Sequence, residues 1–227
     1  MIGFYDYTVI LTYLSLISAS CGIMIALSNG GHPYIGTFFL LFCGLCDAFD
    51  GKVARTKKNR SQAERSFGVQ IDSLSDLVAF GVLPAAIGSA MLRRFGLVSF
   101  VYGTPWERPL EAGATAILIV YILAAMIRLA YYNVTEEERQ KTEDGVRKYY
   151  TGLPVTSSAL IFPLVLLLQY VIPADVTPIY FAIMILCAIA FLSPIQIRKP
   201  GLRGVLILVG IGAVEFLLIL IGKILRH

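Results

Sequence analysis

The chain has 227 residues, of which 57% are hydrophobic and 15% are charged, and its formal net charge is +4. Soluble domains carry roughly 25% charged residues, so this composition excludes an ordinary water-soluble domain and favours a membrane protein. No cleavable signal peptide is expected, because the first apolar segment is too long and has no basic residues before it.

Seven apolar segments follow one another along the chain. Hydrophobic stretches of about 20 residues can cross a bilayer core as helices. The breaks between the segments contain Gly, Pro and charged residues, which are typical of turns. The sequence therefore predicts an all-α, polytopic membrane bundle that forms one domain over residues 1–227. The segments cover residues 8–28, 34–50, 72–92, 111–132, 154–172, 176–194 and 203–222.

Basic residues gather in three of the connecting stretches and predict the orientation of the bundle. The stretch 52–65 contains six Lys or Arg residues, and further basic residues lie in 139–148 and 198–203. Basic loops face the cytoplasm in most membrane proteins, so these three stretches and the N-terminus are expected there. The arginines at 93–94 and the basic residues of 222–227 do not fit this scheme.

Four aspartates stand where the second apolar segment ends and the third begins. Asp47 and Asp50 are three residues apart, and Asp72 and Asp76 are four apart, so each pair lies on one face of a helix. Consecutive spans run in opposite directions, which brings both pairs to one depth at the expected cytosolic boundary. Ionisable groups at such a depth are costly and usually functional.

The aspartate pattern indicates a site for divalent cations. Four carboxylates cannot all stay ionised close together without compensating positive charge. Mg²⁺ or Mn²⁺, bound by carboxylates and substrate phosphates, would supply it, and two ions about 4 Å apart suit phosphoryl transfer. Gly51 and Gly68 leave the backbone bare for a phosphorylated ligand, and Ala54 is small. Arg55 can donate a charge-assisted hydrogen bond to a phosphate oxygen.

Other interpretations of the aspartates explain less of the pattern. Helix capping or pairing with nearby lysines accounts for one or two of them, but not for two same-face pairs on consecutive spans. The residue order is not that of an EF-hand, and no P-loop motif is present. Carboxylates could instead line the ion path of a divalent-cation transporter, although transporters usually bind their ions near the membrane midplane.

The whole pattern, D-x2-D-G-x2-A-R-x12-G-x3-D-x3-D from Asp47 to Asp76, resembles the motif of the CDP-alcohol phosphotransferases. These are integral membrane enzymes of phospholipid synthesis. The gap between Arg55 and Gly68 is longer than in many members. The resemblance implies a homodimeric bundle with a six-helix core, to which the segment 203–222 would add one helix. It also implies a CDP-linked lipid as substrate and CMP as leaving group.

The resemblance also implies roles for the matching residues. Asp47, Asp50, Asp72 and Asp76 would bind two Mg²⁺ or Mn²⁺ ions, and Asp76 would also act as the base. The residues expected to border the CDP-lipid are Asp47, Gly51, Ala54, Arg55, Gly68 and Asp72. Composition supports a carboxylate base independently, because the two histidines of the chain stand in an expected outer loop and at the C-terminus.

Two later stretches bear on the acceptor alcohol. Arg128, followed by Asn133, stands at the inner end of the fourth apolar segment, and Thr151, Gly152 and Pro154 open the fifth. A guanidinium can hold a carboxylate in a bidentate fork, and a helix N-terminus offers N–H groups to an anion. Alternatively, the arginine only extends its charged end to the membrane interface and the turn only starts a helix.

Both stretches resemble those of the bacterial and archaeal phosphatidylserine synthases of this family. The resemblance implies phosphatidyl transfer from CDP-diacylglycerol to L-serine, with glycerol 3-phosphate or inositol phosphate as alternative acceptors. The expected location is the cell membrane, with the active site facing the cytoplasm. No nucleic acid is expected as a partner.

Overall fold

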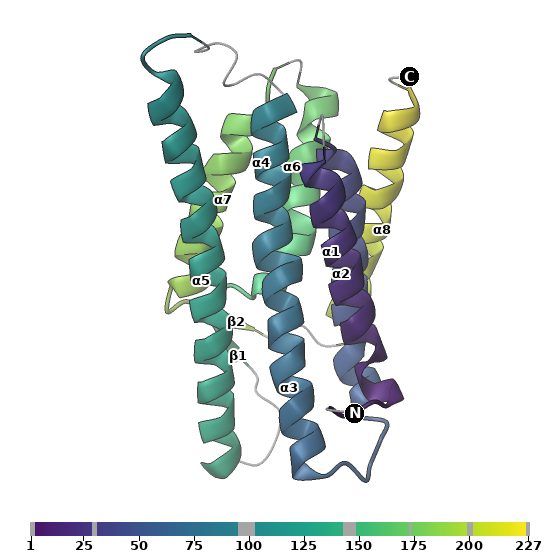
Figure 1. Ribbon diagram of the computed structural model, residues 1–227. Helices are drawn as coiled ribbons and strands as arrows, with labels where there is room; N and C mark the ends of the chain where they lie inside the picture. Colours follow the sequence, from purple (N-terminus) through teal and green to yellow (C-terminus); the bar gives the residue numbers. More distant parts are fainter. Residues whose placement is uncertain are drawn as a thin grey trace.

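The computed structural model describes residues 3–28, 31–94, 103–142, 149–172, 174–198 and 202–225, and it is a bundle of long helices (Figure 1). A two-stranded sheet lies beside the helices. In chain order the elements are η1 (Tyr7–Val9), α1 (Ile10–Leu27), α2 (Pro33–Ala54), α3 (Gln62–Asp76), η2 (Leu77–Val82), α4 (Leu83–Arg94), α5 (Glu107–Thr142), β1 (Tyr149–Thr151), η3 (Val155–Ser157), α6 (Ser158–Val171), α7 (Thr177–Leu192), β2 (Gln196–Arg198) and α8 (Leu202–Leu225).

The helices match the seven predicted apolar segments. Among the described residues, five helical stretches are long and apolar enough to cross a membrane: Tyr7–Leu27, Pro33–Ala54, Gln62–Arg94, Glu107–Arg139 and Gly204–Gly222. Two further apolar helices, Val155–Val171 and Thr177–Leu192, are shorter. The prediction of an all-α, multi-pass membrane bundle is therefore confirmed.

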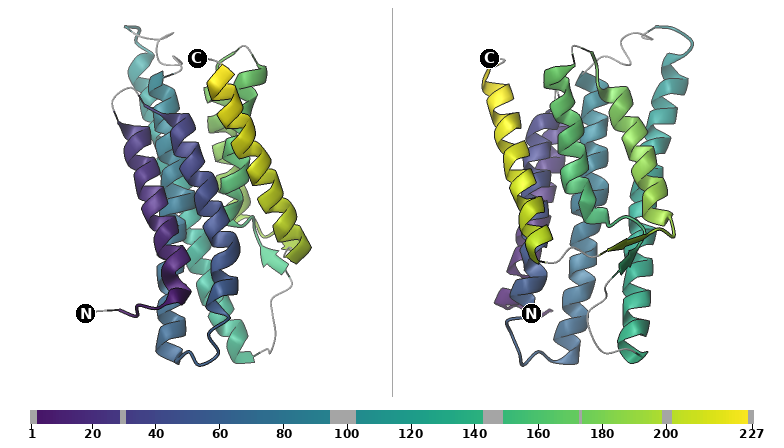
Figure 2. Two further views of the ribbon diagram at one scale, coloured as in Figure 1. Left: turned by 90° about the vertical axis from the view of Figure 1, so that its right-hand side faces the viewer. Right: turned by 180° about the vertical axis from the view of Figure 1, so that it is seen from behind.

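Two of the helical stretches are longer than a bilayer core requires. α3, η2 and α4 form one continuous stretch of 33 residues, and α5 has 36 residues. At 1.5 Å per residue these are about 50 Å and 54 Å long, against a hydrocarbon core of about 30 Å. The start of α3 and the end of α5 lie at the same end of the bundle as the N-terminus (Figures 1 and 2).

Small residues allow the helices to approach one another closely, as is usual in membrane bundles. A Cβ atom on Gly22 of α1 would lie 2.8 Å from the Cβ of Phe39 in α2. A Cβ atom on Gly44 of α2 would lie 2.6 Å from the Cβ of Ala159 in α6. These contacts bring α2 against both α1 and α6. Figure 2 shows that α8 lies along the outside of this group.

The helix that follows Asp76 widens into the π-helical turn η2. Pro84 has no N–H to complete the α-helical hydrogen bond to the carbonyl oxygen of Phe80. The hydroxyl of Tyr121 in α5 donates to that oxygen at 2.7 Å, and it also lies 2.8 Å from the Ser158 hydroxyl at the start of α6. This buried contact fixes α5 and α6 against the helix that carries Asp76.

Candidate active site

The structure brings the four predicted aspartates together from two consecutive helices. Asp47 and Asp50 lie in the last two turns of α2, and Asp72 and Asp76 lie in the second half of α3. The carboxyl groups of Asp50 and Asp72 lie close enough to interact with each other. Asp47 interacts electrostatically with Asp72, and Asp76 interacts with all three others.

This aspartate cluster is partly buried and has no ion-pair partner within the described part of the chain. Asp76 is only 8% exposed and the other three are half-buried. None of the four forms an ion pair with a described lysine or arginine. Four carboxylates need positive charge if they are to stay ionised together. As a set of oxygen donors, they fit a hard divalent cation.

The coordination geometry itself is not formed in the structure. Over the described ranges, no three Asp, Glu, His or Cys side chains lie close enough to hold a single ion. The cluster thus has the oxygen donors that a metal ion needs, but its carboxylates are not close enough together to form a complete set of ligands. Metal binding by these four residues stays a prediction.

An arginine lies beside each of the two glycines predicted to border the CDP-lipid. Arg55 Nη1 lies 3.6 Å from the position that a Cβ atom on Gly51 would take. Arg60 Nη2 lies only 2.7 Å from the corresponding position on Gly68. Arg55 was an expected site residue. Arg60 was not, because nothing in the spacing of the sequence connects it with Gly68.

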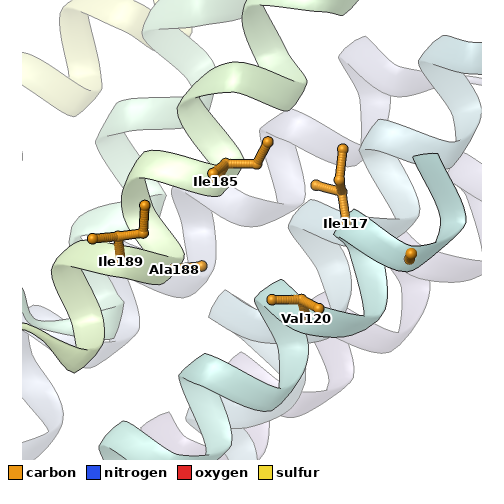
Figure 3. A pocket seen from close by; sticks show the side chains of 6 residues that line it. Ile117, Val120, Ile185, Ala188 and Ile189 are labelled. Carbon is orange, nitrogen blue, oxygen red and sulfur yellow. The ribbon is translucent and has the colours of Figure 1, made fainter. Parts of the chain in front are cut away.

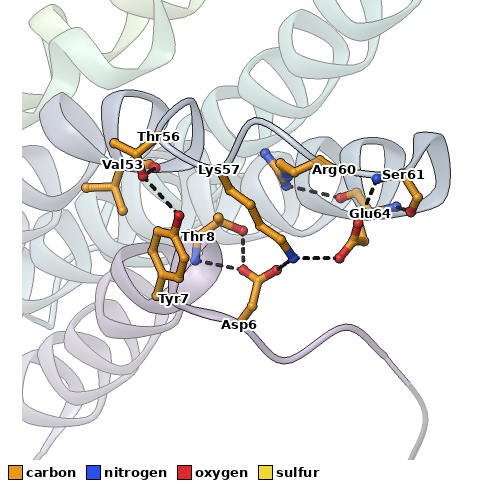
Figure 4. Close-up of polar contacts among 9 residues, drawn as sticks. All are labelled: Asp6, Tyr7, Thr8, Val53, Thr56, Lys57, Arg60, Ser61 and Glu64. Carbon is orange, nitrogen blue, oxygen red and sulfur yellow. Dashed lines mark hydrogen bonds and ion pairs between the residues drawn. The ribbon is translucent and has the colours of Figure 1, made fainter.

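The loop between α2 and α3 is held by polar contacts to the N-terminal segment (Figure 4). Lys57 Nζ bonds to Asp6 Oδ2 at 2.7 Å and to Glu64 Oε1 at 2.8 Å. The bond from Lys57, together with bonds from Thr8, lowers the pKa of Asp6 to about 2. Ser61 and Glu64 form a capping box at the start of α3, which satisfies two backbone N–H groups where the loop enters the helix.

On the acceptor side, Arg128 is buried rather than extended to the interface. Its side chain is 5% exposed, and its Nε donates to the carbonyl oxygen of Leu153 at 3.3 Å. The guanidinium carbon also lies 5.5 Å from the centre of the Tyr132 ring. The structure thus places Arg128 against the loop that precedes α6, and its role toward the acceptor stays a prediction.

The loop before α6 is tied to the end of α7. β1 pairs with β2 in antiparallel register, Thr151 opposite Gln196. The Gly152 N–H donates to the carbonyl oxygen of Ile195 at 2.7 Å, and the Leu153 N–H donates to that of Ala190 at 2.9 Å. These two N–H groups are therefore engaged by the protein, which differs from the expectation of free donors for an anion at this turn.

Gly152 is needed at this turn for its backbone conformation and its size. Its φ angle of +78° lies in the region that favours glycine. A Cβ atom there would also lie 2.7 Å from the carbonyl oxygen of Phe191. This residue therefore acts on the acceptor loop through its packing against α7.

A hollow lies between α5 and α7 (Figure 3), and none of the polar groups described above lines it. It measures about 200 Å³ and exposes no polar surface. A lining of this kind can contact hydrocarbon but cannot orient a charged headgroup. It is formed by Ala116, Ile117, Val120, Ile185, Ala188 and Ile189.

The chain belongs to a known family of membrane enzymes. Residues 8–212 match the family described as CDP-alcohol phosphatidyltransferase. Because this match covers most of the chain and includes all four aspartates, family membership no longer depends on the motif alone.

Individual relatives carry more specific names. The chain is 36% identical over 138 residues to CDP-diacylglycerol–serine O-phosphatidyltransferase of Saccharomyces cerevisiae, a match that covers 60% of this chain and 43% of the relative. It is 30% identical over 148 residues to archaetidylserine synthase of Methanothermobacter thermautotrophicus, with 65% and 53% covered. A CDP-diacylglycerol–serine O-phosphatidyltransferase of Helicobacter pylori is 24% identical over 188 residues, with 81% and 68% covered.

The matched region spans about half the length of the first two relatives. No solved protein structure matches the chain.

Proposed function

We propose that the chain transfers the phosphatidyl group of CDP-diacylglycerol to the hydroxyl of L-serine, giving phosphatidylserine and CMP. One observation carries the proposal beyond the family. Asn133, five residues after Arg128 in α5, donates a 2.7 Å hydrogen bond to Ser73, the neighbour of Asp72. This bond holds the proposed acceptor helix directly beside the aspartate cluster. The names of three relatives, each a serine-lipid synthase, support the same acceptor.

The reaction forms one bond at phosphorus and breaks another. The serine hydroxyl oxygen attacks the phosphorus that carries diacylglycerol. The bond from that phosphorus to the CMP oxygen breaks, and CMP leaves with the electron pair. The hydroxyl proton passes to Asp76, a buried carboxylate that interacts with the other three aspartates. Positioning of the two substrates contributes to the rate as well, because it replaces a bimolecular encounter.

The residues of the chain divide between the two substrates. Asp47, Asp50, Asp72 and Asp76 would hold Mg²⁺ or Mn²⁺, which when bound supplies positive charge for the phosphates and the attacking hydroxyl. Gly51, Ala54, Arg55 and Gly68 border the CDP-lipid. Arg128 holds the serine carboxylate through its planar guanidinium group, and the Thr151–Pro154 turn forms the adjacent wall of the serine site.

Orientation and assembly are part of the proposal. The end of the bundle that carries the α2–α3 loop would face the cytoplasm, because the basic residues of that loop favour this side. The headgroups would react at that membrane edge while the acyl chains remain in the bilayer of the cell membrane. The enzyme would act as a homodimer, as the family resemblance implies.

The test is direct identification of the lipid product. The purified full chain is given CDP-diacylglycerol, Mg²⁺ or Mn²⁺, and one alcohol at a time: serine, glycerol 3-phosphate or inositol phosphate. We expect phosphatidylserine and stoichiometric CMP with serine alone. Product from another alcohol only would overturn the serine assignment. Mn²⁺ uptake into protein-containing liposomes without CMP release would favour a transporter instead.

A further inference from the structure

Two guanidinium groups from the loop between α2 and α3 lie beside glycines that neighbour the aspartates of these two helices. Arg55 lies near Gly51, the residue after Asp50 in α2. Arg60 lies over Gly68, which precedes Asp72 by one helical turn in α3. Arg55 directly follows the last residue of α2, whereas Arg60 lies farther along the lengthened loop between the helices.

The Arg60 side chain is held in place by a hydrogen bond, but not all of its N–H donors have an acceptor among the described residues. Its Nη2 donates to the carbonyl oxygen of Glu64 at 3.1 Å. Its Nε is buried and has no hydrogen-bond acceptor among the described residues, and the side chain forms no ion pair there. Lys57 of the same loop, in contrast, is paired with two carboxylates.

A buried charged donor without an acceptor is costly. The cost would be relieved by a ligand that brings an anionic oxygen to this position. Phosphate is well suited, because a guanidinium donates to its oxygens through a planar fork. Gly68 is expected to border the CDP-lipid, whereas Arg128 and Asn133 of α5 are expected to bear on the acceptor. The position of Arg60 beside Gly68 therefore favours the CDP-lipid as its ligand.

We propose that Arg60 is a further substrate-binding residue, which donates to a phosphate oxygen of the CDP-lipid pyrophosphate opposite Arg55. This inference rests on the proposed function, which makes a pyrophosphate-linked lipid the substrate. The lengthened loop then has a purpose: it delivers a second arginine to the phosphates. The contacts of Lys57 with Asp6 and Glu64 keep the loop in position for it (Figure 4).

The experiment compares Arg60→Ala and Arg60→Gln with Arg65→Ala in the full chain. Arg65 is exposed in the first turn of α3, so its loss removes the same charge from the same region. The Kd for CDP is measured with Mg²⁺ present, together with the KM values for CDP-diacylglycerol and serine. Arg60→Gln retains an amide that can donate to the Glu64 carbonyl, which separates ligand binding from support of the loop.

We expect both Arg60 variants to raise the Kd for CDP and the KM for CDP-diacylglycerol at least about tenfold, as for loss of a charge-assisted hydrogen bond. The KM for serine and all constants of Arg65→Ala should remain near the wild-type values. Unchanged constants in Arg60→Ala overturn the inference. So does tighter CDP binding, because Arg60 would then obstruct the site.

The two proposals fail in different ways. A wild-type protein that makes phosphatidylserine, with an Arg60→Ala variant that binds CDP normally, overturns only the role of Arg60. A wild-type protein whose CDP binding depends on Arg60, but which transfers nothing to serine, overturns only the proposed acceptor.

Discussion

The side-chain amide of Asn133 donates a 2.7 Å hydrogen bond to the hydroxyl of Ser73, and so joins α5 to α3 beside Asp72. If Asn133 acts through this bond, Ser73→Ala and Asn133→Ala should each lower kcat/KM a few-fold to about tenfold. The double variant should be no worse than either single one, because both remove the same interaction. A serine KM that rises only in Asn133→Ala would instead place this residue on the substrate.

Arg128 provides the sharpest test of the acceptor. Arg128→Lys keeps the charge but loses the bidentate fork, so we expect the KM for serine to rise at least about tenfold. Affinity for CDP-diacylglycerol should change little. Serinol, which has no carboxylate, should be a poor acceptor for both proteins and insensitive to the substitution. Arg108→Lys, an exposed position in the first turn of α5, is the matched control.

Replacement of the proposed base should separate catalysis from binding. Asp76→Asn preserves the size of the side chain but removes the proton acceptor, so turnover should fall by about 10²- to 10⁴-fold. Binding of CDP-diacylglycerol should be largely retained. Single-turnover rates and equilibrium binding measure the two effects separately. A variant that keeps more than about a tenth of the wild-type rate at saturating metal would show that Asp76 is not the base.

Asp47 and Asp50 should act through the metal. Asp47→Ala and Asp50→Ala should lose both activity and the metal-dependent part of CDP-diacylglycerol binding, and added Mn²⁺ should restore some of each. The measurement is a Mn²⁺ titration of lipid binding. Glu111→Gln, which removes an exposed carboxylate near the start of α5, serves as control. Normal metal dependence in both alanine variants would refute the assignment.

Tyr121 should contribute to stability more than its exposed neighbours on α5. Tyr121→Phe leaves the buried Ser158 hydroxyl and Phe80 carbonyl with one contact fewer, at a cost of about 1–3 kcal/mol. The temperature of unfolding should fall by about 2–4 °C for each kcal/mol. Tyr131→Phe, at an exposed position, should have little effect. Equal melting of the two variants would exclude a structural role for the buried hydroxyl.

Periodicity was sufficient to predict the helices and the grouping of the aspartates. Asp47 and Asp50, like Asp72 and Asp76, are separated by one helical turn, so a local rule places each pair on one face. The order of the two segments, which run in opposite directions, then brings both pairs to the same end of the bundle. Nothing beyond helix geometry and the order of the segments was required for this part of the site.

The remaining features depend on contacts between residues that are distant in the sequence. β1 and β2 have three residues each and are more than 40 positions apart, so neither carries a recognisable strand pattern. In the sequence, nothing distinguishes Arg60 from the other basic residues of its loop. Only the fold places it beside Gly68. Tyr121 lies in an apolar segment, and only the course of the helix near Pro84 gives its hydroxyl a partner.

The pairing of β1 with β2 has a consequence for the exchange of parts between relatives. The turn beside Arg128 is built from two separate pieces of chain, one before α6 and one after α7, joined through Gly152 and Ile195. A chimera that takes only the piece before α6 from a relative would pair that turn with a segment after α7 that comes from a different protein. Transplanting acceptor preference would therefore require both pieces, 149–157 and 190–198, to be moved together as one cassette.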